Sequence, residues 1–239
     1  MSVRVFSGDD RPVSLAPFGH QLPPDAALLE DLDDPEFVRG CRSAGDRLRR
    51  LHGRGVEPDR RWSSRHEFEA LRAAVNGCHE PALLELMEPL REATAGLAGL
   101  PPVAAHGDCR PGRVLVGPNG DAWWSGSQQS VAAPAAMDVG GFTAHLVRAG
   151  LAGTRPAAVV AAARAAFLIG SGRPRHSAVL AGWELLALTR LAVAAVRLDH
   201  DRRQARLLAA AVADRLHGPR AARLASRLPA GQVSWRRAR

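Results

Sequence analysis

Apolar residues recur at helical spacing through the first hundred residues. Pro35 suits a first helical turn, Asp34 stands where a cap belongs, and Gly53 is the expected end. One apolar stripe follows between them, formed by Phe37, Cys41, Ala44, Leu48 and Leu51. A second helical region starts near Ser64, breaks at Gly77 and ends near residue 99. We therefore predict helices over most of residues 35–99.

The middle of the chain has the pattern of short strands. Residues 103–105 and 114–116 are apolar runs on either side of the segment HGDCRPG. The Gly-Pro-Asn-Gly sequence at 117–120 predicts a turn, and residues 121–124 are expected to return as a partner strand. The two tryptophans of that strand are expected to pack, one inward and one against a helix. A loop rich in Ser, Gln, Ala and Pro is predicted from there to Asp138.

Helical patterns dominate the remaining sequence, at about residues 137–150, 155–170, 177–198 and 200–217. Asp138 is the expected cap of the first of these helices. The most apolar stretch, residues 178–198, contains Glu184 and two arginines, so no membrane helix is predicted. The predicted fold class is α+β, mostly α.

Composition adds a basic balance without a nucleic-acid motif. Hydrophobic residues make up 46% of the chain, enough for a substantial core, and 32 basic against 24 acidic residues give a net charge of +8. Every basic residue is an arginine, a bias that suits a high-GC bacterium. The arginine clusters at 202–203, 220–227 and 236–239 lack interleaved aromatics, so a solvated surface or tail is favoured over nucleic-acid binding.

Three cysteines, Cys41, Cys78 and Cys109, are widely spaced and form no CxxC pair. This arrangement predicts neither a disulfide framework nor a zinc site, and it suits a reducing cytoplasm. The N-terminal residues contain no apolar run of signal-peptide type, so a cytoplasmic location is expected.

Part of the sequence resembles the catalytic segment of aminoglycoside phosphotransferase/choline kinase-type enzymes. It comprises HGDCRPGRVLV, the turn and strand that follow, and the later PAAMDVGGFTAHL. That family typically reads HGDLHPGNVLV, a β-hairpin, an IDF or IDW element, and GDPALDLG before a helix. Residues 28–32 resemble its hinge, where Glu30, Asp31 and Leu32 would lie beside the nucleotide base. Residues 48–52 resemble its LxxLH helix end. The resemblance implies a kinase-like helical C-lobe over residues 26–217, followed by a basic tail at 218–239.

Within this family, Asp108 would stand at the position of the catalytic base and His106 would hold the catalytic loop. The family holds its metal with an Asn five residues after that Asp and with a second Asp after the hairpin. These positions carry Arg113 and Gly126 here. Neither side chain supplies an oxygen, so no metal is expected. ATP or GTP with Mg²⁺ is expected only if the protein is an active kinase.

The family also has a strand-rich N-lobe with a glycine-rich loop and a phosphate-binding lysine. Only residues 1–25 precede the hinge-like segment, and the sequence contains no lysine. We therefore expect the N-lobe to be absent or vestigial. A misplaced start codon, which would omit an N-lobe that the natural protein has, would give the same sequence. The favoured hypothesis is a catalytically impaired pseudokinase that binds a small molecule, peptide or protein. The alternative is an active kinase for a small-molecule or peptide hydroxyl, with an atypical site or one completed by a second chain.

Several side chains near this segment have two interpretations. Arg110 and Arg113 would contact a phosphate or an acidic partner, or else form salt bridges with Asp108 or Asp121. A metal site of His106, Asp108 and Cys109 is disfavoured because the ligands crowd one loop. Cys109 lacks an orienting base, which disfavours a nucleophilic role. His145 is expected to be a core or interface histidine.

Overall fold

The protein is described by a computed structural model at residues 25–54, 62–126, 131–172 and 177–217. Its helices are α1 (Asp34–His52), α2 (Ser64–Asn76), α3 (Pro81–Thr94), α4 (Ala135–Leu151), α5 (Ala157–Gly170), α6 (Ser177–Arg197) and α7 (Arg202–His217). These confirm the predicted helices to within two residues in most places. The predicted irregular segment before residue 25 and the predicted basic tail lie outside the described residues.

The helix α1 begins one residue earlier than its sequence suggests. Asp33, not Asp34, is the N-cap, because its Oδ1 accepts a hydrogen bond from the Glu36 amide at 2.9 Å. Asp34 is the first helical residue, and its carboxylate pairs with Arg155. The predicted apolar stripe from Phe37 to Leu51 is buried.

Two small antiparallel sheets lie beside the helices. β1 (Ala27–Leu28), β3 (Val114–Val116) and β4 (Ala122–Trp124) form one sheet in the order β1-β3-β4. The predicted turn between β3 and β4 closes with a hydrogen bond from Gly120 N–H to Gly117 O at 2.9 Å. The second sheet pairs β2 (Val103–Ala105) with β5 (Val131–Ala133). β5 was predicted as loop, since a three-residue strand flanked by Ser and Pro has no periodicity to reveal it.

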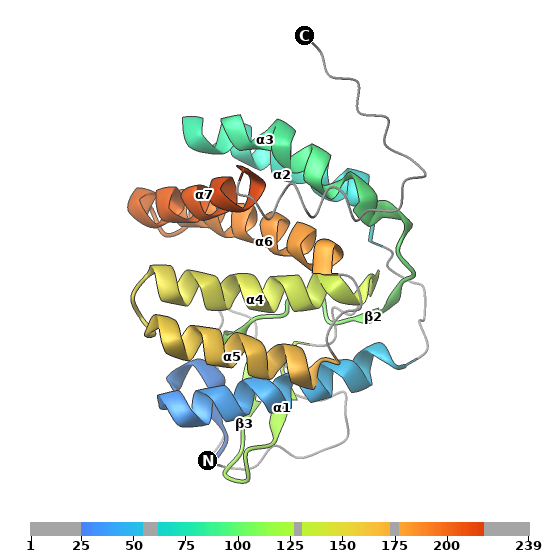
Figure 1. Cartoon of the computed structure of the whole chain (residues 1–239), viewed down its shortest axis with the longest axis vertical. Coiled ribbons are helices and arrows are strands. Elements are labelled where there is room, and N and C mark those ends of the chain that lie inside the picture. Colours follow the sequence, from blue (N-terminus) through green and yellow to red (C-terminus); the bar gives the residue numbers. More distant parts are fainter. Residues whose placement is uncertain (1–24, 55–61, 127–130, 173–176, 218–239) are drawn as a thin grey trace.

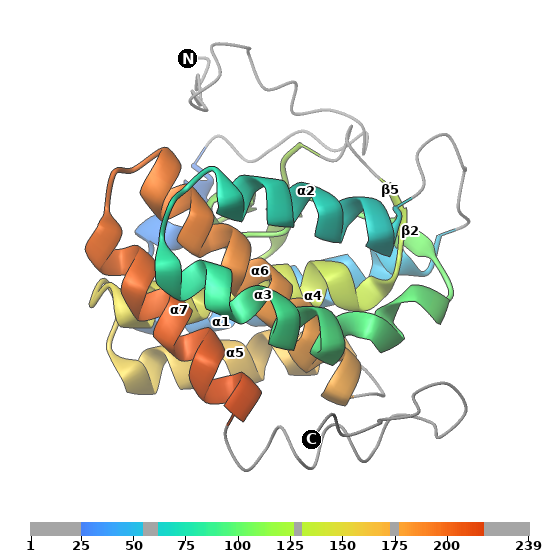
Figure 2. The same cartoon turned by 90° about the horizontal axis from the view of Figure 1, so that it is seen from above.

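The helices are stacked in layers, with α4 running through the middle of the molecule (Figure 1). On one side of α4, residues of α1, α5, β3 and β4 form a core around Leu48, Phe142 and Phe167. On the other side, α2, α3, α6 and α7 form a second core around Trp183, Leu188 and Leu208. Seen from above, α2 and α3 cover α6 (Figure 2). The site described below lies where α4 meets the two sheets.

Glycines allow α1 and α5 to pack backbone to backbone. A Cβ on Gly45 would lie 2.4 Å from the Phe167 carbonyl oxygen, and a Cβ on Gly170 would lie 2.1 Å from the Arg42 carbonyl oxygen. Both distances are shorter than any van der Waals contact. The two helices therefore approach each other only because these positions lack side chains.

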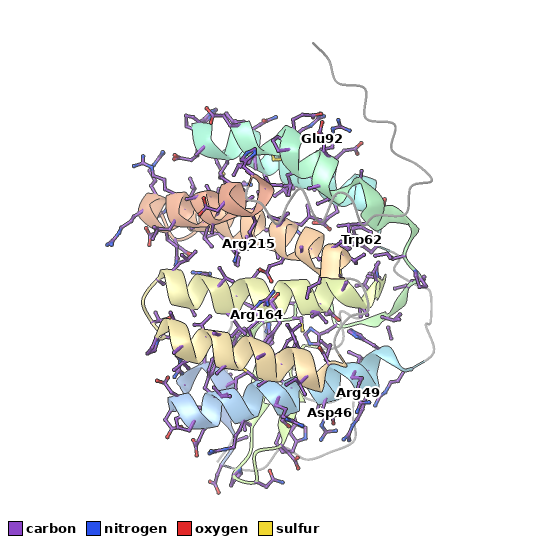
Figure 3. The ribbon with its side chains drawn as sticks, viewed as in Figure 1. Asp46, Arg49, Trp62, Glu92, Arg164 and Arg215 are labelled. Carbon is purple, nitrogen blue, oxygen red and sulfur yellow. The ribbon has the colours of Figure 1, made fainter. Side chains whose placement is uncertain are left out.

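The apolar helix α6 belongs to the interior. The window Ala178–Arg197 has the length and mean hydropathy (1.7) of a membrane-spanning helix, but 78% of it is buried inside the protein. Its acidic residue Glu184 is buried, and it forms a hydrogen bond with an arginine of one helix and an ion pair with an arginine of another. Arg164 of α5 lies 2.9 Å from one carboxylate oxygen and Arg215 of α7 lies 3.4 Å from the other (Figure 3). These pairings account for a charge within so apolar a helix.

Candidate functional site

The segment from His106 to Arg113 forms a loop that leads from β2 through a short 3-10 helix (Pro111–Arg113) into β3. Gly107 in this loop has φ of +85°, a conformation that favours glycine. The turn after β2 therefore depends on the glycine of the HGD sequence.

Asp138 of α4 holds the start of this loop. Its buried carboxylate accepts hydrogen bonds from the amides of His106 (2.7 Å) and Gly107 (2.9 Å). The same carboxylate lies 2.9 Å from Nε2 of His52, the last residue of α1. The prediction that Asp138 caps its own helix was wrong, because α4 starts three residues earlier, after Pro134, and the side chain turns toward the loop. Asp138 thus joins three parts of the fold at one point.

His106 is fully buried and has a defined tautomer. Its Nδ1 accepts a hydrogen bond from the Asp108 amide (3.3 Å), so Nε2 carries the proton and donates to the Ser125 carbonyl oxygen (2.9 Å). Burial lowers the pKa of His106, against the attraction of Asp138, and so keeps the ring neutral. The ring connects the loop to the residue that follows β4.

Both arginines of the loop contact Asp108. Nε of Arg113 donates to Oδ2 at 2.7 Å, and Nε of Arg110 lies 3.1 Å from Oδ1, close enough for an ion pair but not aligned as a hydrogen bond. Burial alone would raise the pKa of Asp108, but the Arg113 hydrogen bond and the two positive charges together lower it. The site therefore combines one carboxylate of low basicity with two guanidinium groups.

Arg113 also lies beside Gly126, the other position at which the resembled family holds its metal. A Cβ on Gly126 would be 4.0 Å from the guanidinium carbon of Arg113. The two metal positions are therefore neighbours in space, and a permanent cation lies between Gly126 and Asp108. Within the described ranges, no group of three His, Cys, Asp or Glu side chains is arranged to hold a metal ion. The described residues at this place do not fit Mg²⁺, because the guanidinium repels it and no oxygen ligand among them replaces the lost ones.

The hinge-like segment lies against the same loop. A Cβ on Gly112 would meet the Glu30 carboxylate at 3.0 Å, and Leu29 just before it is fully buried. Arg155, from the connection between α4 and α5, donates to the carbonyl oxygens of Glu30 (2.8 Å) and Leu32 (2.6 Å). Asp31, the third residue expected at the hinge, is exposed. The main chain of this segment is therefore tied to the helical body by a side chain that the sequence analysis did not single out.

Of two other candidate residues, Cys109 is buried and His145 is half-buried. Cys109 is enclosed, and burial raises its pKa well above the usual range, which removes the thiolate that a nucleophile needs. His145 of α4 lies among Arg110, Arg148 and Asp108, and burial lowers its pKa to about 4. It is neutral at pH 7, as a core histidine would be.

Among the functional side chains, sequence analysis identified His106, Asp108 and Arg113 but missed the structural role of Arg155. The tie between His52 and Asp138 was within reach, since both residues belong to segments that carry the family resemblance. Nothing in the sequence around Arg155 distinguishes it from the other arginines. On the β-hairpin, Trp124 is buried and donates to the Ala44 carbonyl oxygen (3.1 Å), while Trp123 lies under Arg47.

Comparison with known proteins supports the fold. No protein-family model and no curated protein sequence matches the chain. Among solved structures, a glucosamine kinase matches with a TM-score of 0.60 and 21% identity over 83% of this chain. A choline/ethanolamine kinase family protein from Mesorhizobium loti matches with a TM-score of 0.60 and 17% identity over 85% of this chain. A choline kinase from Streptococcus pneumoniae matches with a TM-score of 0.52 and 14% identity over 81%. The chain thus has the aminoglycoside phosphotransferase/choline kinase-like fold.

The similarity covers part of each relative. This chain spans 58% of the length of the glucosamine kinase structure and 70% of the Mesorhizobium protein. At these identities the similarity establishes the fold, and function has to be argued from the site itself.

Proposed function

We propose that this chain is a member of the phosphotransferase superfamily that has a binding or partner role and does not transfer phosphate by the metal-dependent route. The observation that carries this proposal is the Arg113 guanidinium, which is hydrogen-bonded to Asp108 and adjacent to Gly126. Metal-dependent phosphoryl transfer requires cations that bridge the phosphates and a carboxylate that accepts the hydroxyl proton. A fixed arginine in this place opposes the first requirement and weakens the second.

The carboxylate of Asp108 is a poor general base in this setting. Both of its oxygens lie within 3.1 Å of a guanidinium nitrogen, and its pKa is below the usual value. General-base catalysis is most effective when the pKa of the base lies near the working pH. The retained loop therefore serves the fold and a binding surface with two arginines better than it serves proton transfer.

That surface suits an anionic group. The guanidinium groups of Arg110 and Arg113 flank Asp108, and all three side chains remain partly open to solvent. A phosphate or the carboxylate of an acidic partner segment would be attracted here, with Arg110 as the more exposed donor. We propose such a group as the ligand of the site.

The direct test is a phosphoryl-transfer assay with Mg·ATP and, separately, Mg·GTP. Amino sugars, amino alcohols and hydroxyl-bearing peptides serve as acceptors. We expect no product beyond that of a protein-free control. Metal-dependent phosphorylation that disappears in Asp108→Ala would overturn the proposal and favour the alternative of an active kinase with an atypical or partner-completed site.

Nucleotide binding is tested separately by thermal unfolding. A ligand that binds only the folded protein raises the melting temperature by mass action. We expect no shift with millimolar nucleotide and Mg²⁺. A clear shift that requires Mg²⁺ would support the kinase alternative even where the acceptor is not among those assayed.

A further inference from the structure

A second candidate site lies on the other side of the molecule, between α2, α3 and α6. A hollow of about 360 Å³ opens here, and Trp62, labelled in Figure 3, is one of the residues that line it. Its apolar surface comes from Trp62, Phe68, Leu97 and Leu186, and the charged residues Glu69, Arg72 and Arg91 also line it. None of these residues belongs to the HGD loop or to the elements that hold it. The volume is within the range of small-molecule sites, about 300–1,000 Å³.

The aromatic wall of this hollow is fixed before any ligand arrives. Trp62 packs against Trp183 with ring centroids 4.6 Å apart, and its amide donates to the Ala132 carbonyl oxygen at 2.9 Å. Its indole nitrogen donates to Glu67 at 3.3 Å. A rigid aromatic surface loses little entropy on binding, which favours affinity for an apolar group.

The charges on the rim are not equivalent. Arg91 is held by the Glu88 carboxylate, with Nε 2.9 Å from Oε2. Arg72 is exposed and has no ionic partner among the residues that the structure describes. A guanidinium at the mouth of an apolar hollow selects ligands that carry a carboxylate or another oxyanion.

We propose that this hollow binds a small organic anion with a compact apolar body. The body would lie against Trp62 and Phe68, and its acidic group would meet Arg72. The chain's own segment 218–239 is strongly basic, so its charge has the same sign as Arg72 and makes it a poor occupant. The inference is independent of the proposed function, because it uses neither Asp108 nor a nucleotide.

The test uses three probes with one body and different head groups: 3-phenylpropanoate, 3-phenylpropanamide and 3-phenylpropylamine. Each is titrated into the full chain by isothermal calorimetry at low salt. The carboxylate should bind about fivefold more tightly than the amide, the size expected of one exposed charge pair. The amine should bind most weakly. Equal or tighter binding of the amine would overturn the proposal.

Variants test the charged part and the apolar part of this hollow separately. Arg72→Gln should remove the preference for the carboxylate while leaving the affinity for the amide unchanged. Arg39→Gln on α1 makes the same change of charge elsewhere and should keep the preference. Ala95→Trp places a large side chain over the hollow from an exposed position and should weaken all three probes at least tenfold, with an unchanged circular dichroism spectrum. Undiminished binding in Ala95→Trp, or no binding of any probe at millimolar concentration, would overturn the proposal.

Discussion

Replacement of Asp138 should destabilise the protein more than the loss of any exposed carboxylate. Its buried side chain accepts from two main-chain amides, those of His106 and Gly107, and contacts the His52 ring. In Asp138→Ala the buried His106 amide and the part-buried Gly107 amide lose their acceptor, at about 1–3 kcal/mol each. With a smaller loss at His52, the free energy of unfolding should fall by about 4 kcal/mol, a large fraction of the total for a typical domain.

The assay is urea unfolding followed by far-UV circular dichroism, with the free energy obtained by linear extrapolation. Asp138→Asn keeps one carbonyl oxygen but turns an NH₂ group toward a donor, so we expect an intermediate loss of about 2 kcal/mol. The matched control is Asp121→Ala, an exposed carboxylate that accepts from Asn119 in the hairpin turn. Its loss should stay within about 0.5 kcal/mol. A cost below about 1 kcal/mol for Asp138→Ala would refute the argument that this side chain organises the loop.

Three further predictions follow from burial and close packing. The pKa of His145 is lowered to about 4, so between pH 6.5 and 4 the unfolded chain binds a proton that the folded protein excludes. As the pH falls through this range, the free energy of unfolding should therefore decrease, by at most about 3 kcal/mol. Urea unfolding at several pH values measures this loss, and His145→Gln should reduce it. Burial raises the pKa of Cys41 to about 12 and that of Cys109 well above its usual range. Ellman's reagent at pH 8 should therefore modify neither thiol before denaturation. Rapid modification of both thiols in the native protein would contradict their burial. Gly45→Ala should lower the free energy of unfolding by at least about 2–3 kcal/mol, because its Cβ would overlap the Phe167 carbonyl oxygen. Gly77→Ala, whose Cβ would make only ordinary contacts at 3.6 Å, should change it by less than about 1 kcal/mol. Equal effects in thermal or urea unfolding would contradict the close approach of α1 and α5.

Much of the fold was predictable because long helices carry a periodic signal. The stripe from Phe37 to Leu51 gave α1, and the glycine-rich turn at 117–120 gave the β3–β4 hairpin. β5 was missed because three residues cannot show a period, and the N-cap of α1 was misplaced by one residue because two adjacent aspartates compete for it. Local sequence determines elements of this kind only when they are long enough or chemically distinct.

The sequence predicted the residues of the loop at the candidate site, but not the residues that hold this loop and the hinge-like segment in place. His106, Asp108 and Arg113 fall within one motif, so spacing alone brought them together. The contact between Arg113 and Gly126 depends on the return of the hairpin, and the attachment of the hinge-like segment by Arg155 spans more than 120 residues of sequence. Such long-range contacts leave no local pattern when every basic residue outside the histidines is an arginine.

The measurement that tests the central claim most directly is Mn²⁺ binding, followed by electron paramagnetic resonance, in the wild-type chain and in the double variant Arg113→Asn/Gly126→Asp. Gly126 has φ of +82°, a conformation that aspartate tolerates better than most residues, so the variant should fold. If the Arg113 guanidinium stands in the place of a metal, the wild type should show no saturable site at millimolar Mn²⁺. The double variant should then bind at least tenfold more tightly. Equal, saturable binding by both proteins would contradict the account.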